Sequence, residues 1–456
     1  MRRFTGVSDT LPRMSSPPGP PRSSGIVIRP DIPICQTDLP LDSYQSEFQP
    51  YAEEYLALPD RTPACVLPWM DGYLERAIDA LGPELMLLAH YYMGGEIVKL
   101  VERYGGTIAD SYQLAREAVL HPEKKIFVES AVHFMAEAIA LLAAPDQQVY
   151  ITNPRSGCTM EMMAKGFMVE PAFDSLRARF GDDLMVIAYM NTSGRVKALA
   201  GRTGGAVCTS SNAGAIVRWA RAQGRRIFFV PDEHLGRNVA AQVGIPDQAT
   251  YRLPAGHDGA DLESLSESDK KSLDRAELIL WGAFCGVHTV FRPEHVEYWR
   301  ERGYTVVVHP ESPRETVALA DGAGSTRYLW NHVMQAPAGS RFAVATEGHF
   351  VRNLTEQAGQ RGIQVVHLAD VPGTQAAGCG CATMSRNDPP HLVATLDLLR
   401  QGKAPDINRV LAGDVVDEIT GFRERLEPDA RAEIAQSARQ ALERMIEITE
   451  AASPPG

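Results

Sequence analysis

The stretch that decides the fold reads LMLLAHYY, residues 85–92. Leu85–Ala89 is a short, continuous apolar run, and it ends in the triplet His90-Tyr91-Tyr92. Apolar runs of this length are typical of strands buried on both faces of a parallel sheet. From residue 85 onward such runs alternate with segments of helical period, which predicts βαβ units and an α/β fold.

The same layout occurs three times along the chain. The apolar runs at 184–188 and 304–308 lead into two further triplets, Tyr189-Met190-Asn191 and His309-Pro310-Glu311. A turn rich in hydroxyl groups follows each triplet after a helix-length gap, at Ala109-Asp110-Ser111, Thr209-Ser210-Ser211-Asn212 and Gly324-Ser325-Thr326. Each unit closes with a loop that carries cysteine, at 153–158, 282–285 and 371–381.

This repeat predicts three similar αβα (Rossmann-like) domains with parallel sheets, arranged around a pseudo-threefold axis. Ligands of open α/β sheets bind at the carboxyl ends of the strands, so the triplets, turns and cysteine loops are expected to face one central site. We expect a proline-rich tail and covering segment over 1–68, which leads into a helix near 70–81. The three domains are predicted over 69–165 (completed by C-terminal helices at 386–451), 166–286 and 287–385.

Composition narrows the function classes. The chain has 456 residues and a formal net charge of −12, which argues against nucleic acid as a partner. No apolar run reaches the ~18 residues that a membrane-spanning helix needs, so we expect no membrane partner. The cysteines are odd in number and follow no secretory signal, which favours reduced thiols and a cytoplasmic protein.

Three cysteines that converge from three units would form a metal site. The spacing matches neither a zinc site nor the cysteine run of ferredoxins. Three thiolates can hold a 4Fe-4S cluster and leave one iron open as a Lewis acid. The alternative is that each of Cys158, Cys285 and Cys379 or Cys381 is a small buried hydrophobic residue; from the residues alone, Cys379 and Cys381 stay equivalent candidates.

The strand ends carry groups suited to proton transfer and anion binding. His, Glu and Tyr side chains transfer protons, and these types occur at His90, Tyr92, His309 and Glu311. Helices that begin near 209–212 and 324–326 would offer backbone N–H groups to carboxylate or phosphate. The same hydroxyl residues are also ordinary N-caps, and a histidine at a strand end can be a satisfied buried residue.

Twelve short phrases now identify a relative. In order they read LAHYY (88–92), ADSYQLA (109–115), VHFMAE (132–137), NPRSGC (153–158), YMNTS (189–193), KAL (197–199), CTSSNA (208–213), PDEHLGRN (231–238), GAFCGVH (282–288), HPE (309–311), GST (324–326) and CATM (381–384). With these phrases the chain, from about residue 81 to 451, resembles the quinolinate synthase family, iron–sulfur enzymes of bacterial NAD biosynthesis.

The resemblance implies a transferase that condenses iminoaspartate with dihydroxyacetone phosphate to quinolinate, phosphate and two waters. It also implies one 4Fe-4S cluster per chain and a functional link to L-aspartate oxidase. By position, the cluster ligands would be Cys158, Cys285 and Cys381, the last chosen over Cys379 by its place in the CATM phrase. The catalytic residues would be Glu311, Tyr92 and His309. The substrate would be bound by His90, Ser111, Tyr189, Asn191, Ser210, His288, Ser325 and Thr326.

Two other functions fit the same cysteines. One is a different three-cysteine 4Fe-4S hydro-lyase, and the other is an iron–sulfur sensor without catalysis. A sensor needs no proton-transfer residues, so the combination of Glu311, His309 and Tyr92 favours an enzyme.

Overall fold

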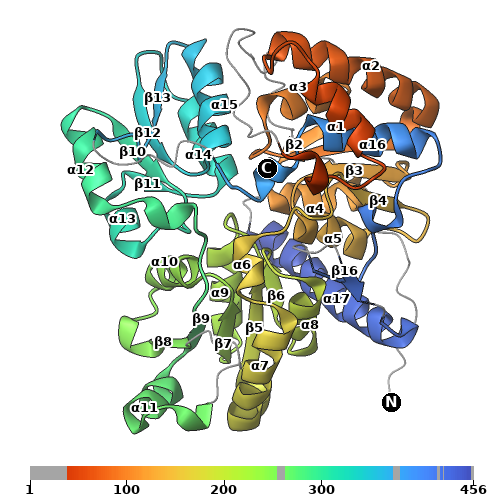
Figure 1. Ribbon diagram of the computed structural model, residues 1–456. Helices are drawn as coiled ribbons and strands as arrows, with labels where there is room; N and C mark the ends of the chain where they lie inside the picture. Colours follow the sequence, from red (N-terminus) through yellow and green to blue (C-terminus); the bar gives the residue numbers. More distant parts are fainter. Residues whose placement is uncertain (1–38, 254–261, 373–379, 418–421, 425, 453–456) are drawn as a thin grey trace.

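The computed structural model of the protein describes residues 39–253, 262–372, 380–417, 422–424 and 426–452. Three sheets with their helices form three lobes around a common centre (Figure 1). The short strand β14, which lies in the C-terminal segment, joins the first sheet. The domain boundaries themselves stay a prediction.

The first sheet has the strand order β14-β4-β3-β1-β2. Its parallel strands are β1 (Leu85–His90), β2 (Thr107–Ala109), β3 (Ile126–Ser130) and β4 (Gln148–Ile151), and β14 (Arg409–Val410) pairs antiparallel with β4. The helices that connect them are α3 (Gly95–Arg103), α4 (Ser111–Leu120) and α5 (His133–Leu142). All of β1 is buried, as its unbroken apolar run predicts.

The second sheet has the order β6-β5-β7-β9-β8 and is parallel throughout. Its strands are β5 (Leu184–Tyr189), β6 (Ala206–Cys208), β7 (Arg226–Val230), β8 (Thr250–Leu253) and β9 (Leu278–Trp281). Its helices are α6 (Thr159–Met162), α7 (Gly166–Phe180), α8 (Gly194–Arg202), α9 (Ala213–Ala222), α10 (Glu233–Val243) and α11 (Glu267–Arg275).

The third sheet has the order β11-β10-β12-β13 and is also parallel. Its strands are β10 (Thr305–Val308), β11 (Gly322–Ala323), β12 (Arg341–Ala345) and β13 (Gln364–His367). The helices are α12 (Pro293–Glu301), α13 (Arg314–Leu319), α14 (Thr326–Met334) and α15 (Gly348–Gly359).

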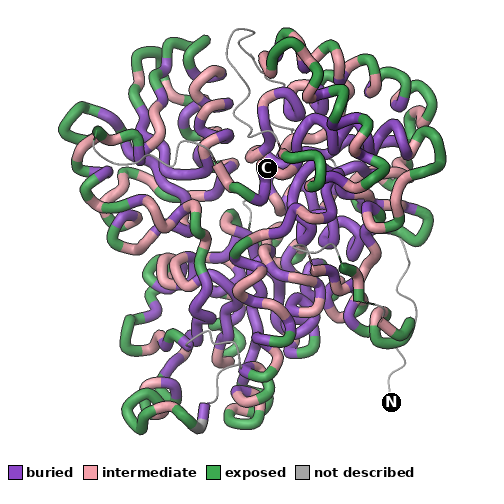
Figure 2. The backbone as a smooth tube through the Cα atoms, in the orientation of Figure 1, coloured by how far each residue is buried: buried purple, intermediate pink, exposed green. Residues whose placement is uncertain are grey.

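One strand order recurs in all three sheets. The first strand lies between the second and the third, and a further parallel strand follows the third; β8 adds an edge to the second sheet only. This confirms the predicted α/β fold of repeated αβα units. The first strands β1, β5 and β10 therefore occupy equivalent places, and the strands of each lobe are mostly buried (Figure 2).

The two end segments differ in detail from the sequence expectation. The covering segment contains a helix, α1 (Gln49–Leu56), and α2 (Pro63–Leu81) begins earlier than the predicted 70–81. Pro63 stands at the start of α2, where proline costs no hydrogen bond.

The C-terminal part is helical as predicted, in α16 (Pro389–Arg400) and α17 (Pro428–Ala452), with the short strands β15 (Val415–Asp417) and β16 (Phe422–Glu424) between them. The most extensive contacts of α17 are with α8 of the second lobe, while α16 packs on α1 and α2. Across the described ranges, no helix is both long and apolar enough to cross a membrane.

Candidate active site

A cavity lies where the three lobes meet. Residues from all three sheets line it: His90, Tyr92, Asp110, Ser111, Val132, Phe134, Met135, Cys158, Tyr189, Met190, Asn191, Thr209, Ser210, Cys285, Val287, His288, His309, Glu311, Thr326, Cys381, Thr383 and Met384. Every site residue predicted from the sequence is among them except Ser325. Segments separated by some 290 residues of chain thus contribute to one cavity because equivalent strand ends point to the same centre.

Glu311 is the most connected group in the cavity. It follows β10, is 3 % exposed, and accepts a hydrogen bond from the Tyr189 hydroxyl through Oε1. Its Oε2 lies 2.9 Å from Nδ1 of His288. Burial opposes the charge of this carboxylate, but His288 and His309 outweigh it and lower the pKa of Glu311 below its usual range. Glu311 is therefore an ionised hydrogen-bond acceptor at neutral pH.

The histidines at the ends of β1 and β10 share one local arrangement. Nδ1 of His90 accepts the backbone N–H of Tyr92 at 3.2 Å, and Nδ1 of His309 accepts that of Glu311 at 3.4 Å. Burial lowers the pKa of His90 to about 4, and burial with neighbouring His288 lowers that of His309 to about 3. Both rings are neutral at pH 7, and because Nδ1 accepts, the proton lies on Nε2. Each ring can thus donate one hydrogen bond from Nε2.

A third histidine, His288, connects the second and third lobes. It lies in the loop that follows β9, and its ring stacks on that of His309 with 4.4 Å between centroids. Its Nε2 lies 3.2 Å from the hydroxyl of Thr346, which in turn lies 2.9 Å from the Tyr92 hydroxyl. Thr346 thereby joins two of the predicted site residues.

The cysteines from three separate loops line the same cavity. Cys158 precedes α6, Cys285 follows β9, and Cys381 lies in the loop before α16. Burial raises the pKa of the Cys285 thiol, and the charges of Glu311, Cys158 and Cys381 raise it further. All three cysteines thus line one cavity, although they come from three separate loops.

The donor atoms around Cys285 suit a metal. Its sulfur, a ring nitrogen of His288 and a carboxylate oxygen of Glu311 all lie within 4.8 Å of one another. Sequence reasoning grouped Cys285 with the other thiols, whereas the structure also brings an imidazole and a carboxylate to it. Cys208 is buried in β6 and does not line the cavity, while Cys379 and Cys35 lie outside the described residues.

The predicted hydroxyl turns divide between capping and the cavity. The Ser325 side chain caps α14 by accepting the N–H of Tyr328 at 3.3 Å, and Asp110 caps α4 by accepting that of Gln113 at 3.0 Å. Ser111 and Thr326, the first residues of α4 and α14, line the cavity. The Ser325 side chain is therefore an N-cap and does not line the cavity.

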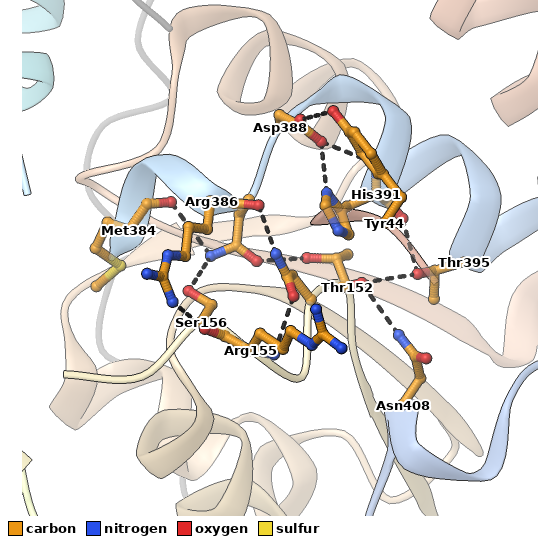
Figure 3. Close-up of polar contacts among 12 residues, drawn as sticks. Tyr44, Thr152, Arg155, Ser156, Met384, Arg386, Asp388, His391, Thr395 and Asn408 are labelled. Atoms are coloured by element: carbon orange, nitrogen blue, oxygen red, sulfur yellow. Dashed lines mark hydrogen bonds and ion pairs between the residues drawn. The ribbon is translucent and has the colours of Figure 1, made fainter. Parts of the chain in front are cut away.

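Buried hydrogen bonds join the Cys158 loop to the Cys381 loop. Ser156 donates to the carbonyl of Thr383 at 2.8 Å, and Asn387 donates from Nδ2 to the Ser156 hydroxyl and to the carbonyl of Ala131, both at 2.7 Å. Thr152 donates to Oδ1 of Asn387 at 2.9 Å. Figure 3 shows Thr152, Ser156, Met384 and Arg386 around this network.

Two further bonds reinforce the same junction. Asn153 donates from Nδ2 to the carbonyl of Arg386 at 2.7 Å, and Arg386 donates to the carbonyl of Arg155 at 3.1 Å. The relative placement of these two cysteine loops is therefore fixed by side chains and not only by chain connectivity.

Sequence reasoning missed Thr346 and Asn387. Thr346 directly follows β12, so the end of that strand was the signal available for it. Asn387 precedes the helix start Asp388-Pro389, where an asparagine is common for local reasons. Its long-range partners are not readable from the sequence around it.

The chain is similar in sequence to several known proteins. A family model described as "Quinolinate synthetase A protein" matches residues 78–447. The quinolinate synthase of Streptomyces coelicolor is 34 % identical over 386 residues, which cover 83 % of this chain and 93 % of the relative. The quinolinate synthase of Corynebacterium glutamicum is 33 % identical over 428 residues, which cover 93 % of this chain and 97 % of the relative. The quinolinate synthase of Geobacillus kaustophilus is 36 % identical over 373 residues, which cover 81 % of this chain and 91 % of the relative.

Proposed function

Because the chain belongs to the quinolinate synthase family, we propose that it condenses iminoaspartate with dihydroxyacetone phosphate. The products are quinolinate, inorganic phosphate and two waters, so atoms balance and no external oxidant or reductant is needed. The new pyridine ring takes two carbons and the nitrogen from iminoaspartate and three carbons from the triose, and the other two carbons of iminoaspartate become the two carboxylates. In this reaction the chain is a transferase.

One observation carries the proposal. A single buried cavity combines three thiols from three loops with a hydrogen-bonded carboxylate and neutral imidazoles. A sensor would need the thiols but not the network of Tyr189, Glu311 and His288. That network favours catalysis over sensing.

The cofactor of this proposal is one 4Fe-4S cluster per chain, held by Cys158, Cys285 and Cys381. The three thiols suit it because cysteine sulfur is the usual ligand of such clusters and all three line one cavity. When bound, the iron without a cysteine ligand would act as a Lewis acid on substrate oxygen atoms.

The residues around the cluster position would bind the anionic substrates. His90 and His309 donate from Nε2, and neutral donors in a buried site bind carboxylate or phosphate well. Ser111 and Thr326 begin α4 and α14, where backbone N–H groups and the helix dipole favour anions. Ser210 and the Asn191 amide line the same cavity and add donors. Ser325 would act through its cap, which fixes the start of α14.

Proton transfers fall to the Glu311 network and to Tyr92. The carboxylate of Glu311 accepts a hydrogen bond from the Tyr189 hydroxyl and lies beside Nδ1 of His288, so it can take up a proton from the substrate within a hydrogen-bonded network. Tyr92, whose hydroxyl lies 2.9 Å from that of Thr346, would transfer protons to and from the carbon skeleton of the triose phosphate. Ring formation and loss of water need several such transfers.

The proposal also places the enzyme in a reaction sequence. Iminoaspartate is the product of oxidising the amine of aspartate, so an oxidase of L-aspartate must supply it. Quinolinate then enters NAD biosynthesis in the cytoplasm.

Anaerobic purification tests the function directly. We expect about four iron atoms and four sulfides per chain, a brown colour, and quinolinate formation from dihydroxyacetone phosphate and freshly generated iminoaspartate. The Cys285→Ser variant should lose iron and activity. Cys208→Ala, a buried cysteine outside the cavity, is the matched control and should keep both. A colourless, iron-free protein that still forms quinolinate would contradict the cofactor, and a brown protein that forms none would contradict the reaction.

A further inference from the structure

Glu347 is a fully buried carboxylate that lies next to the cavity without lining it. It directly follows Thr346 and is the N-cap of α15, where Oε2 accepts the backbone N–H of Phe350 at 3.0 Å. Oε1 lies 2.9 Å from Nδ1 of His349. An N-cap needs only one of these bonds, so the carboxylate has acceptor capacity beyond capping.

The remaining capacity is used by a proposed cluster ligand. The backbone N–H of Cys381 donates to Oε1 of Glu347 at 2.9 Å. The preceding residue, Gly380, packs directly on this carboxylate: a Cβ at Gly380 would overlap Oε1 of Glu347 and would lie 2.7 Å from Nδ1 of His349. The Cys381 loop therefore approaches Glu347 at a distance that only glycine permits.

The other end of the same loop is fixed to the first lobe. The carbonyl of Thr383 accepts from Ser156, and Asn387 donates to Ser156 and to the carbonyl of Ala131, which directly follows β3 of the first sheet. The loop is thus held between the third lobe, through Glu347, and the Cys158 loop, through Ser156 and Asn387. Cys381 lies between these two attachments.

We propose that Glu347 is a positioning residue for the cofactor, which holds the backbone of Cys381 so that its thiol stays on the cluster. This rests on the proposed function. Without the bond from the Cys381 N–H to Glu347, a part-buried donor loses its acceptor. Groups that orient metal ligands from outside typically contribute 10–100-fold to metal affinity.

Glu347→Asp separates this role from capping. Aspartate is among the best N-cap residues, so α15 keeps its cap. The side chain is shorter by one carbon–carbon bond, about 1.5 Å, which withdraws the carboxylate from Cys381. Gly380→Ala perturbs the same contact from the other side and leaves Glu347 intact. Ser266→Ala is the control, because Ser266 caps α11 by accepting the N–H of Asp269 and is not among the residues that line the cavity.

The measurements use the anaerobically purified full chain. Iron and sulfide per chain, the rate of iron loss to a chelator and the midpoint potential report on the cluster, while thermal unfolding and circular dichroism report on the fold. We expect Glu347→Asp and Gly380→Ala to lose iron at least about tenfold faster than the wild type. Their secondary structure should be unchanged, and Ser266→Ala should behave as the wild type in iron loss.

Three outcomes would overturn the inference. If Glu347→Asp keeps wild-type iron, potential and rate of iron loss, Glu347 does not position Cys381, while the proposed function stands. If Ser266→Ala loses iron as fast as Glu347→Asp, the effect is one of general stability. If the wild type binds no iron at all, both this inference and the cofactor proposal fail.

Discussion

Replacing Glu311 with glutamine is the most direct test of the acid–base network. The side chain keeps its shape but loses its charge. In the wild type both the Tyr189 hydroxyl and Nδ1 of His288 face carboxylate oxygens. An amide offers one oxygen, so one of these two partners faces an NH₂ group instead.

The size of the effect follows from two contributions. Removing a general acid or base typically lowers the rate by about 10²–10⁴-fold, or about 3–5 kcal/mol of activation free energy. His288 and His309 hold the pKa of Glu311 low against its burial, and a carboxylate of low pKa is a weak proton acceptor. We therefore expect the lower end of the range, a fall in kcat of about 10²-fold.

The assay measures quinolinate formed anaerobically at saturating substrates, together with iron per chain. Iron should stay at the wild-type level, because Glu311 is not one of the three proposed cysteine ligands. Glu117→Gln is the control: Glu117 is equally buried, lies on α4 and does not line the cavity. A kcat of Glu311→Gln within about threefold of the wild type, with full iron, would refute the role of Glu311.

Three further predictions concern stability. Burial raises the pKa of Glu129, and its carboxyl oxygens have no hydrogen-bond partner among the described residues. Relative to Glu129→Gln, the wild type should therefore lose about 1.4 kcal/mol of unfolding free energy for each pH unit above about 4.5. Urea titrations over pH 5–8 measure this slope, and the exposed control Glu53→Gln should not change it. Burial lowers the pKa of His90 to about 4 in the folded protein, so the unfolded chain takes up this proton at a higher pH than the folded chain does. Relative to His90→Gln, the wild type should lose about 3 kcal/mol of unfolding free energy as the pH falls from 6.5 to 4. Equal dependence of the unfolding free energy on pH in the two proteins would contradict this prediction. Asn387→Ala leaves several buried groups unpaired and should cost about 3 kcal/mol or more in chemical denaturation, whereas a loss below about 1 kcal/mol would show that the network is dispensable.

The sequence reveals the parts of this fold that follow from local patterns. Parallel strands that are buried on both faces consist of continuous apolar runs. The runs at 85–89, 184–188 and 304–308 could therefore be located directly from the sequence. Each run ends at the sheet edge where ligands bind, and polar residues there are candidates for the site. His90, Asn191 and Glu311 were found in this way, and all three line the cavity.

The residues that were missed depend on long-range contacts. Thr346 is a single hydroxyl after a strand, and only the fold brings it to Tyr92 and His288. Glu347 has the local appearance of an N-cap, and its bond to Cys381 spans 34 residues of chain. The early start of α2 was missed because prolines were taken as breaks, although Pro63 at the first helical position is compatible with a helix.

The junction of the three lobes has a consequence for the integrity of the whole polypeptide. Each lobe contributes one thiol, and no pair of lobes contains the complete set. Cleavage of the chain that separates any lobe from the others therefore leaves fragments that cannot rebuild the cavity unless they reassociate. Assembly of this cavity therefore reports that all three lobes have reached their native arrangement.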